Sequence, residues 1–86
     1  MRLAPQNARY AYVQGVALHD TGKMAEAIAV LTKTLTANPF DPGVLAALGE
    51  YHLEAGHIDL ARGYTQRLLA LNPLDQGAQA LASRLR

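Results

Sequence analysis

Apolar side chains recur every three or four positions along this chain, the spacing that places them on one face of an α-helix. One such stripe consists of Met24, Ala27, Ile28, Leu31 and Leu35. Another consists of Val44, Leu45, Leu48, Tyr51 and His52. The pattern therefore predicts amphipathic helices that bury their apolar faces against one another.

The expected ends of these helices carry residues that favour caps and turns. Asn7, Asp41 and Asp75 each precede a helical stretch, where a side-chain oxygen can accept a hydrogen bond from a free backbone N–H. Gly22 and Gly56 follow helical stretches, at positions that favour a left-handed backbone. Two Asn-Pro pairs end the other helices, because the residue before proline disfavours the helical conformation. The sequence thus predicts helices over 8–21, 24–37, 42–55, 58–71 and 76–86, and their short connections make neighbouring helices antiparallel.

The chain also repeats itself with a period of 34 residues, the spacing of its prolines at positions 5, 39 and 73. At the same offset glycine falls on glycine and alanine on alanine, without an insertion. Gly15 and Gly49 are one such pair, and both lie inside predicted helices, where glycine costs up to about 1 kcal/mol relative to alanine. We interpret them as sites where the paired helix approaches closely, across Ala27 and Ala61.

Composition narrows the class of protein. Of the 86 residues, 50% are hydrophobic and 17% are charged, with a net charge of +1, which excludes both a disordered chain and a strongly basic one. The 16 Ala and 14 Leu favour helix over strand, and the absence of Cys excludes disulfides and thiolate metal sites. No apolar run approaches the roughly 18 residues of a membrane span, and no signal peptide is visible. Whether the chain is cytoplasmic or periplasmic depends on the parent protein.

With its period and its helix pairs, the chain resembles the tetratricopeptide repeat family, whose pattern is W-x2-L-G-x2-Y, A-x3-F and P. The matching residues of the first repeat are Ala11, Gln14, Gly15, Leu18, Ala27, Leu31 and Pro39. Those of the second repeat are Leu45, Leu48, Gly49, His52, Ala61, Thr65 and Pro73. The small residues and prolines match, whereas Gln14, His52 and Thr65 depart from the large residues of the pattern.

The resemblance implies an all-α, right-handed solenoid of two antiparallel helical hairpins and a C-terminal capping helix. Residues 1–7 then match the end of a preceding repeat, 8–41 and 42–75 form the two repeats, and 76–86 form the cap. We expect this chain to be the C-terminal segment of a larger bacterial protein of the family.

The resemblance further implies a non-catalytic module that binds a peptide or a partner surface through its concave face, lined by the first helix of each pair. Carried over residue by residue, the groove-facing positions that we select are Arg9, Tyr12, Val16, His19, Glu50, Leu53, Glu54 and Arg84. Members of the family that bind chaperones clamp a peptide carboxylate with Lys and Asn side chains, and the corresponding positions here hold Tyr12, Val16, Ala46 and Glu50. A carboxylate clamp is therefore disfavoured, because Glu50 would repel the ligand. We expect a ligand of basic or aromatic character.

Other classes of function find little support in the sequence. It has no nucleophile, phosphate-binding or dinucleotide-binding motif and no basic stripe for nucleic acid, so we expect no enzyme and no cofactor. His52 and His57 are five residues apart, which is not a spacing that places two ligands on one helical face, so we expect no metal site. The alternative function is structural, a packing or homodimerisation element that associates through apolar residues such as Tyr10 and Val13.

Overall fold

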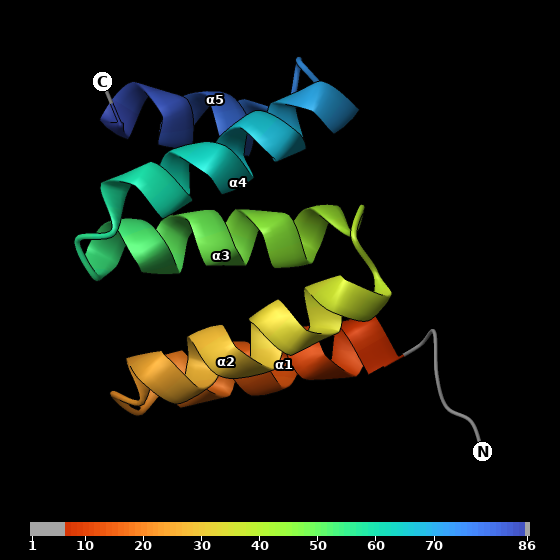
Figure 1. Cartoon of the computed structure of the whole chain (residues 1–86), viewed down its shortest axis with the longest axis vertical. Coiled ribbons are helices and arrows are strands. Elements are labelled where there is room, and N and C mark those ends of the chain that lie inside the picture. Colours follow the sequence, from red (N-terminus) through yellow and green to blue (C-terminus); the bar gives the residue numbers. More distant parts are fainter. Residues whose placement is uncertain (1–6, 86) are drawn as a thin grey trace.

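The computed structural model describes residues 7–85, which form five helices and no strand (Figure 1). The helices are α1 (Asn7–Asp20), α2 (Met24–Ala37), α3 (Pro42–Glu54), α4 (Ile58–Leu71) and α5 (Gln76–Arg84). They stack one after another along the long axis of the molecule, with α1 and α2 at one end and α5 at the other (Figure 1). The prediction of an all-α helical repeat is confirmed.

The helix boundaries agree with the predicted ones to within two residues. α2 and α4 have the predicted bounds, α1 is shifted by one residue, and α3 ends one residue early. α5 ends at Arg84 because the N–H of Leu85 donates to the carbonyl of Ala82, three residues back, at 3.1 Å. The proposed tail of a preceding repeat, residues 1–6, and Arg86 lie outside the described residues.

The predicted caps of α3 and α5 are confirmed. The Asp41 carboxylate accepts a hydrogen bond from the N–H of Val44 at 3.0 Å, and the Asp75 carboxylate accepts one from Ala78 at 2.8 Å. Each bond satisfies a backbone donor that has no partner within its helix. The side chain of Asn7, for which a cap was also predicted, is outside the described part of the chain.

Gly22 and Gly56 adopt the predicted left-handed backbone, with φ of 83° and 85°. In each turn the following residue, Lys23 or His57, donates its N–H to the carbonyl five residues earlier at 2.8 Å. This hydrogen-bond pattern ends α1 and α3 and reverses the chain into α2 and α4.

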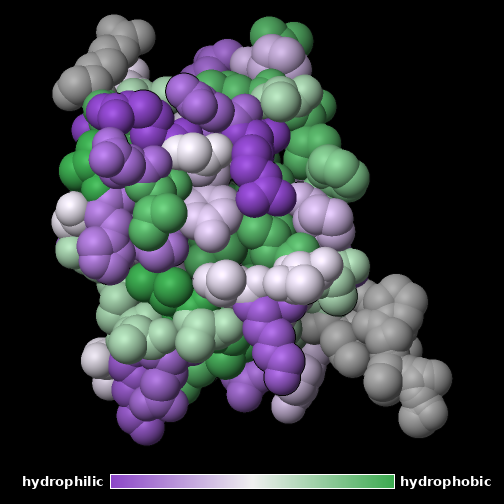
Figure 2. Space-filling view, viewed as in Figure 1, coloured by the Kyte–Doolittle hydropathy of each residue, from purple (hydrophilic) through white to green (hydrophobic). Residues whose placement is uncertain are grey.

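The core is centred on α3, which contacts each of the other four described helices. Three leucines from α2 and α3, Leu31, Leu45 and Leu48, are almost fully buried there, and Leu68 joins them from α4. Viewed as in Figure 1, the outer surface is a mosaic in which hydrophilic and hydrophobic side chains both occur along the whole array (Figure 2).

The two helix-interior glycines do allow close packing; the partner of Gly15 differs from the expected alanine, whereas Ala61 does lie near Gly49, with its carbonyl oxygen 3.7 Å from the position of a Cβ. A Cβ atom on Gly15 would lie 2.9 Å from Cγ of Leu31, so a leucine rather than Ala27 fills this space. On Gly49 it would lie 2.8 Å from Cδ2 of Leu81 and 3.3 Å from Oγ1 of Thr65. Large side chains of neighbouring helices therefore occupy the volume that a Cβ would need.

The three departures from the family pattern have structural explanations. Thr65 is buried, and its hydroxyl donates to the carbonyl of Ala61 at 2.8 Å, so the polar group is satisfied inside α4. His52 is also buried and stacks on Tyr64, with ring centroids 5.5 Å apart. Gln14 is exposed because its side of α1 is not covered by another described helix.

Candidate functional site

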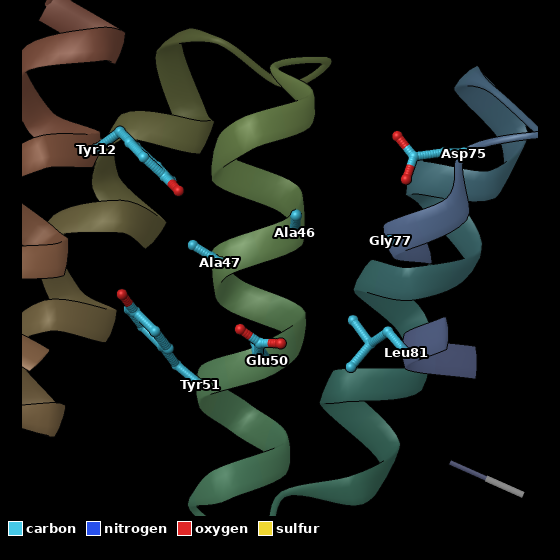
Figure 3. A pocket seen from close by; sticks show the side chains of 8 residues that line it. All are labelled: Tyr12, Ala46, Ala47, Glu50, Tyr51, Asp75, Gly77 and Leu81. Carbon is cyan, nitrogen blue, oxygen red and sulfur yellow. The ribbon is translucent and has the colours of Figure 1, made fainter. Parts of the chain in front are cut away.

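A cavity of about 170 Å³ opens where α1, α3 and the start of α5 meet (Figure 3). Its lining residues are Tyr12, Ala46, Ala47, Glu50, Tyr51, Asp75, Gly77 and Leu81. α1, α3 and α5 occupy the first-helix position of successive repeats, and we call the side they form the α1–α3–α5 surface. The small residues Ala46, Ala47 and Gly77 leave the volume that becomes this cavity.

Two tyrosines form one side of the cavity. Tyr12 extends from α1 toward α3 and is 39% exposed, whereas Tyr51 extends from α3 and is buried (Figure 3). Tyr51 stacks on His19, with parallel rings whose centroids are 4.2 Å apart. Burial raises the pKa of the Tyr51 hydroxyl, and the neighbouring Tyr12 adds to this effect, so the Tyr51 phenol remains a neutral hydrogen-bonding group at physiological pH.

His19 connects α1 to α3 on the same surface. Its Nε2–H donates to Oε1 of Glu54 at 2.8 Å, and its Nδ1 lies 3.4 Å from Oδ1 of Asp20. The bond to Glu54 raises the pKa of His19, and Asp20 contributes in the same direction. Since carboxylates only accept, the doubly protonated ring is the form that donates to both neighbours.

Glu50 lies on α3, the helix between α1 and α5, and its side chain pairs with Arg84 of α5. Its Oε2 accepts from Nη1 of Arg84 at 3.2 Å, and both side chains are about half exposed. A second carboxylate, that of Asp75, lines the cavity opposite Glu50 while it caps α5 (Figure 3). The walls thus carry two carboxylates and two phenols, which together favour a cation.

A second, larger cavity of about 420 Å³ lies between the start of α1 and the start of α3. It is lined by Ala8, Arg9, Tyr12, Val13, Asp41, Pro42 and Gly43. Tyr12 lines both cavities, so a ligand that extends along the α1–α3–α5 surface would contact this ring in either one.

The structure brings some of the candidate groove residues together and separates others. Tyr12 and Glu50 line the smaller cavity, and Arg9 and Tyr12 line the larger one. Glu50 and Glu54 pair in opposite directions, with Arg84 of α5 and with His19 of α1. Val16 and Leu53 line neither cavity, and Leu53 packs instead against a cluster of Ala61, Leu81 and Leu85.

Sequence reasoning missed several lining residues of the smaller cavity, among them Tyr51, Ala47, Asp75 and Leu81. The sequence pattern places Tyr51 on the apolar stripe of its helix and Asp75 at a helix cap, and both residues also fulfil those roles. The pattern of one helix shows which residues are buried. It does not show that a buried tyrosine and a capping carboxylate also border the same cavity.

The two histidines of the α3–α4 turn are closer than their spacing of five residues indicated. Nδ1 of His52 and Nδ1 of His57 are 3.1 Å apart, so one ring donates and the other accepts. The turn between them brings the rings together, which a continuous helix would not do. No group of three or more potential metal ligands occurs within residues 7–85.

A comparison with known protein families matches residues 18–85 to the tetratricopeptide repeat. The chain belongs to the tetratricopeptide repeat family. The search of curated proteins found no match. Repeats of this family generally mediate protein–protein interactions and are typically non-catalytic. No helix in the described part of the chain is long and apolar enough to cross a membrane.

Proposed function

We propose that this chain binds a peptide segment of a protein partner along its concave face, the α1–α3–α5 surface. The observation on which this proposal rests is the cavity between α1, α3 and α5, with Tyr12 and Glu50 at its border. A cavity of about 170 Å³ is large enough for one anchoring side chain of a peptide. One anchoring side chain with polar contacts beside it is typical of peptide recognition.

The larger cavity supports the same proposal. It continues the surface past Tyr12 to Arg9, so an extended peptide has apolar contacts at Val13 and Pro42 and charged groups on both sides. His19 and Glu54 hold α1 against α3 along the same surface. Such a pre-formed surface lowers the ordering cost of binding.

A peptide array probed with the intact chain tests this function. Tyr12→Ala is expected to lower the affinity for the bound peptides about tenfold or more, since a central aromatic residue often contributes more than 1 kcal/mol to an interface. Tyr10→Ala is the matched control, because Tyr10 lies on the same helix and is exposed but lines neither cavity. Glu50→Lys, with Glu26→Lys on α2 as its control, tests the charge of the same site. If no peptide binds, or if binding ignores both changes, the proposal is wrong.

Self-association is the second candidate function, and a specific observation favours it. Tyr10 and Val13, three residues apart on α1, are 71% and 59% exposed. Exposed apolar residues that lie close together on one helix favour association. Sedimentation at high micromolar concentration is expected to show dimers that Tyr10→Ser with Val13→Ser converts to monomers. A chain that is strictly monomeric contradicts this candidate.

A further inference from the structure

The smaller cavity has an acidic and phenolic border. Glu50 and Asp75 carry its charges, and no Lys, Arg or His is among its lining residues. The ring of Tyr12 adds a partly exposed π-face, and the two tyrosines add hydroxyl oxygens, which also attract cations. A ligand carboxylate would meet two like charges, whereas a guanidinium or ammonium group would meet two opposite ones.

Arg84 already satisfies part of this preference. It reaches from the last turn of α5 and donates to Oε2 of Glu50 at 3.2 Å. Both side chains are about half exposed, and pairs of this kind contribute little net free energy because water and salt screen them. The guanidinium is therefore held at the rim of the cavity by a bond that an incoming cation can replace.

We propose that the cavity binds an arginine or lysine side chain of the bound peptide. In the free protein Arg84 pairs with Glu50, and the cationic side chain of the peptide replaces Arg84 in this pair. The inference rests on the proposed peptide-binding function and specifies its ligand. Arg84 then acts as an internal competitor, so its removal strengthens binding of a cationic peptide. An aromatic ligand would leave the Glu50–Arg84 pair in place, and its affinity would not depend on Arg84.

Blocked alanine peptides with one central residue test the inference by titration under nuclear magnetic resonance. The central residue is arginine, lysine, phenylalanine or citrulline, the neutral analogue of arginine. The arginine and lysine peptides are expected to shift the backbone signals of Tyr12, Glu50 and Tyr51 and to bind at least fivefold more tightly than the citrulline peptide.

Two variants examine the competition. Arg84→Gln is expected to raise the affinity for the arginine peptide about two- to fivefold, the range that corresponds to the loss of one exposed ion pair. Lys33→Gln removes the same charge from the exposed surface of α2 and is expected to change the affinity much less. Glu50→Gln is expected to lower the affinity for the arginine peptide. In the double variant with Glu50→Gln, Arg84→Gln is expected to have no further effect on this affinity.

The failures of the two proposals are distinguishable. If the citrulline or phenylalanine peptide binds as tightly as the arginine peptide, the cationic specificity is wrong while concave-face binding stands. Equal effects of Arg84→Gln and Lys33→Gln overturn the competition. A peptide array without any binding peptide overturns the proposed function itself. An array with binding peptides, together with alanine peptides that shift no signal in this cavity, overturns the inference alone.

Discussion

α1 and α3 occupy the same position in successive repeats, yet only α3 is a core helix. Leu48 of α3 is fully buried, whereas Gln14, 34 residues earlier, is exposed. Val44 is likewise fully buried, and its counterpart Tyr10 is 71% exposed. α3 has helices on both sides along the array, while α1 contacts only α2 and α3 among the described helices.

The difference shows that burial in this chain depends on the neighbouring repeat as much as on the repeat itself. In a helical repeat, contacts between adjacent units provide a large part of the stability. α3 receives such contacts from α2 on one side and from α5 on the other. The departure at Gln14 therefore follows from its place on the side of α1 that no other described helix covers.

Truncating the two equivalent side chains is expected to give the largest contrast. Leu48→Ala removes a fully buried side chain and is expected to lower the free energy of unfolding by about 2–5 kcal/mol, because it leaves a cavity in the core. Gln14→Ala is expected to change it by less than about 0.5 kcal/mol, as at other exposed sites. Urea unfolding of both variants measures the difference. Similar losses would show that α1 is as covered as α3.

Substituting the two helix-interior glycines, Gly15 of α1 and Gly49 of α3, is expected to give a smaller difference in stability, and here the variant in α1 loses more. Gly15→Ala places its Cβ within 2.9–3.1 Å of three carbons of the fully buried Leu31, including the branch point, which cannot rotate away. We expect a net loss of about 1–2 kcal/mol, because strain exceeds the gain of about 1 kcal/mol in helix propensity.

At Gly49 the nearest atom is a terminal methyl of Leu81, which a rotamer change can move. Gly49→Ala is therefore expected to lose less stability than Gly15→Ala, although Thr65 limits the available space. Urea unfolding of the two variants makes the comparison. A larger loss at Gly49 would mean that Leu81 is fixed as firmly as Leu31.

His19 of α1 and His52 of α3 are expected to give the smallest effect. Each makes the free energy of unfolding depend on pH, and the two dependences have opposite signs. Burial lowers the pKa of His52, and the adjacent His57 lowers it further. As the pH falls below the ordinary value of 6.5, the unfolded chain binds a proton that folded His52 resists, so stability is lost on the acidic side. Glu54 raises the pKa of His19, so its contribution is present below 6.5 and is lost as the pH rises through the raised pKa.

Unfolding midpoints measured between about pH 5 and 8 separate the two histidines. His52→Tyr is expected to remove the acidic loss, and His19→Gln is expected to remove the loss toward higher pH. If the acidic loss persists in His52→Tyr, another group controls the turn between α3 and α4.

Much of the fold could be predicted from local signals. Asp41 and Asp75 mark helix starts because a cap needs only one carboxylate three residues before a backbone N–H. Gly22 and Gly56 mark helix ends because few other residues tolerate a positive φ. Such signals act within a few residues of the chain, and they gave helix boundaries accurate to within two residues.

The candidate site could be predicted only in part. The resemblance to the tetratricopeptide repeat indicated Tyr12 and Glu50, because the groove-facing positions of that family carry over to this chain residue by residue. It did not reveal that Glu50 pairs with Arg84 or that Glu54 pairs with His19, which is 35 residues away. Nor did it reveal that Leu53 packs toward α5. These contacts depend on how far one repeat is rotated against the next.

The sequence by itself determined the helices, their caps, the period and the family of this protein, because each of these depends on residues close in the chain or at one constant offset. Only the tertiary structure decided which side of α1 stays uncovered, that a leucine rather than an alanine fills the space beside Gly15, and that Tyr51 and Asp75 border one cavity. The physical reason is that helix packing brings together atoms from distant residues, and small differences in side-chain size and rotation set which atoms meet.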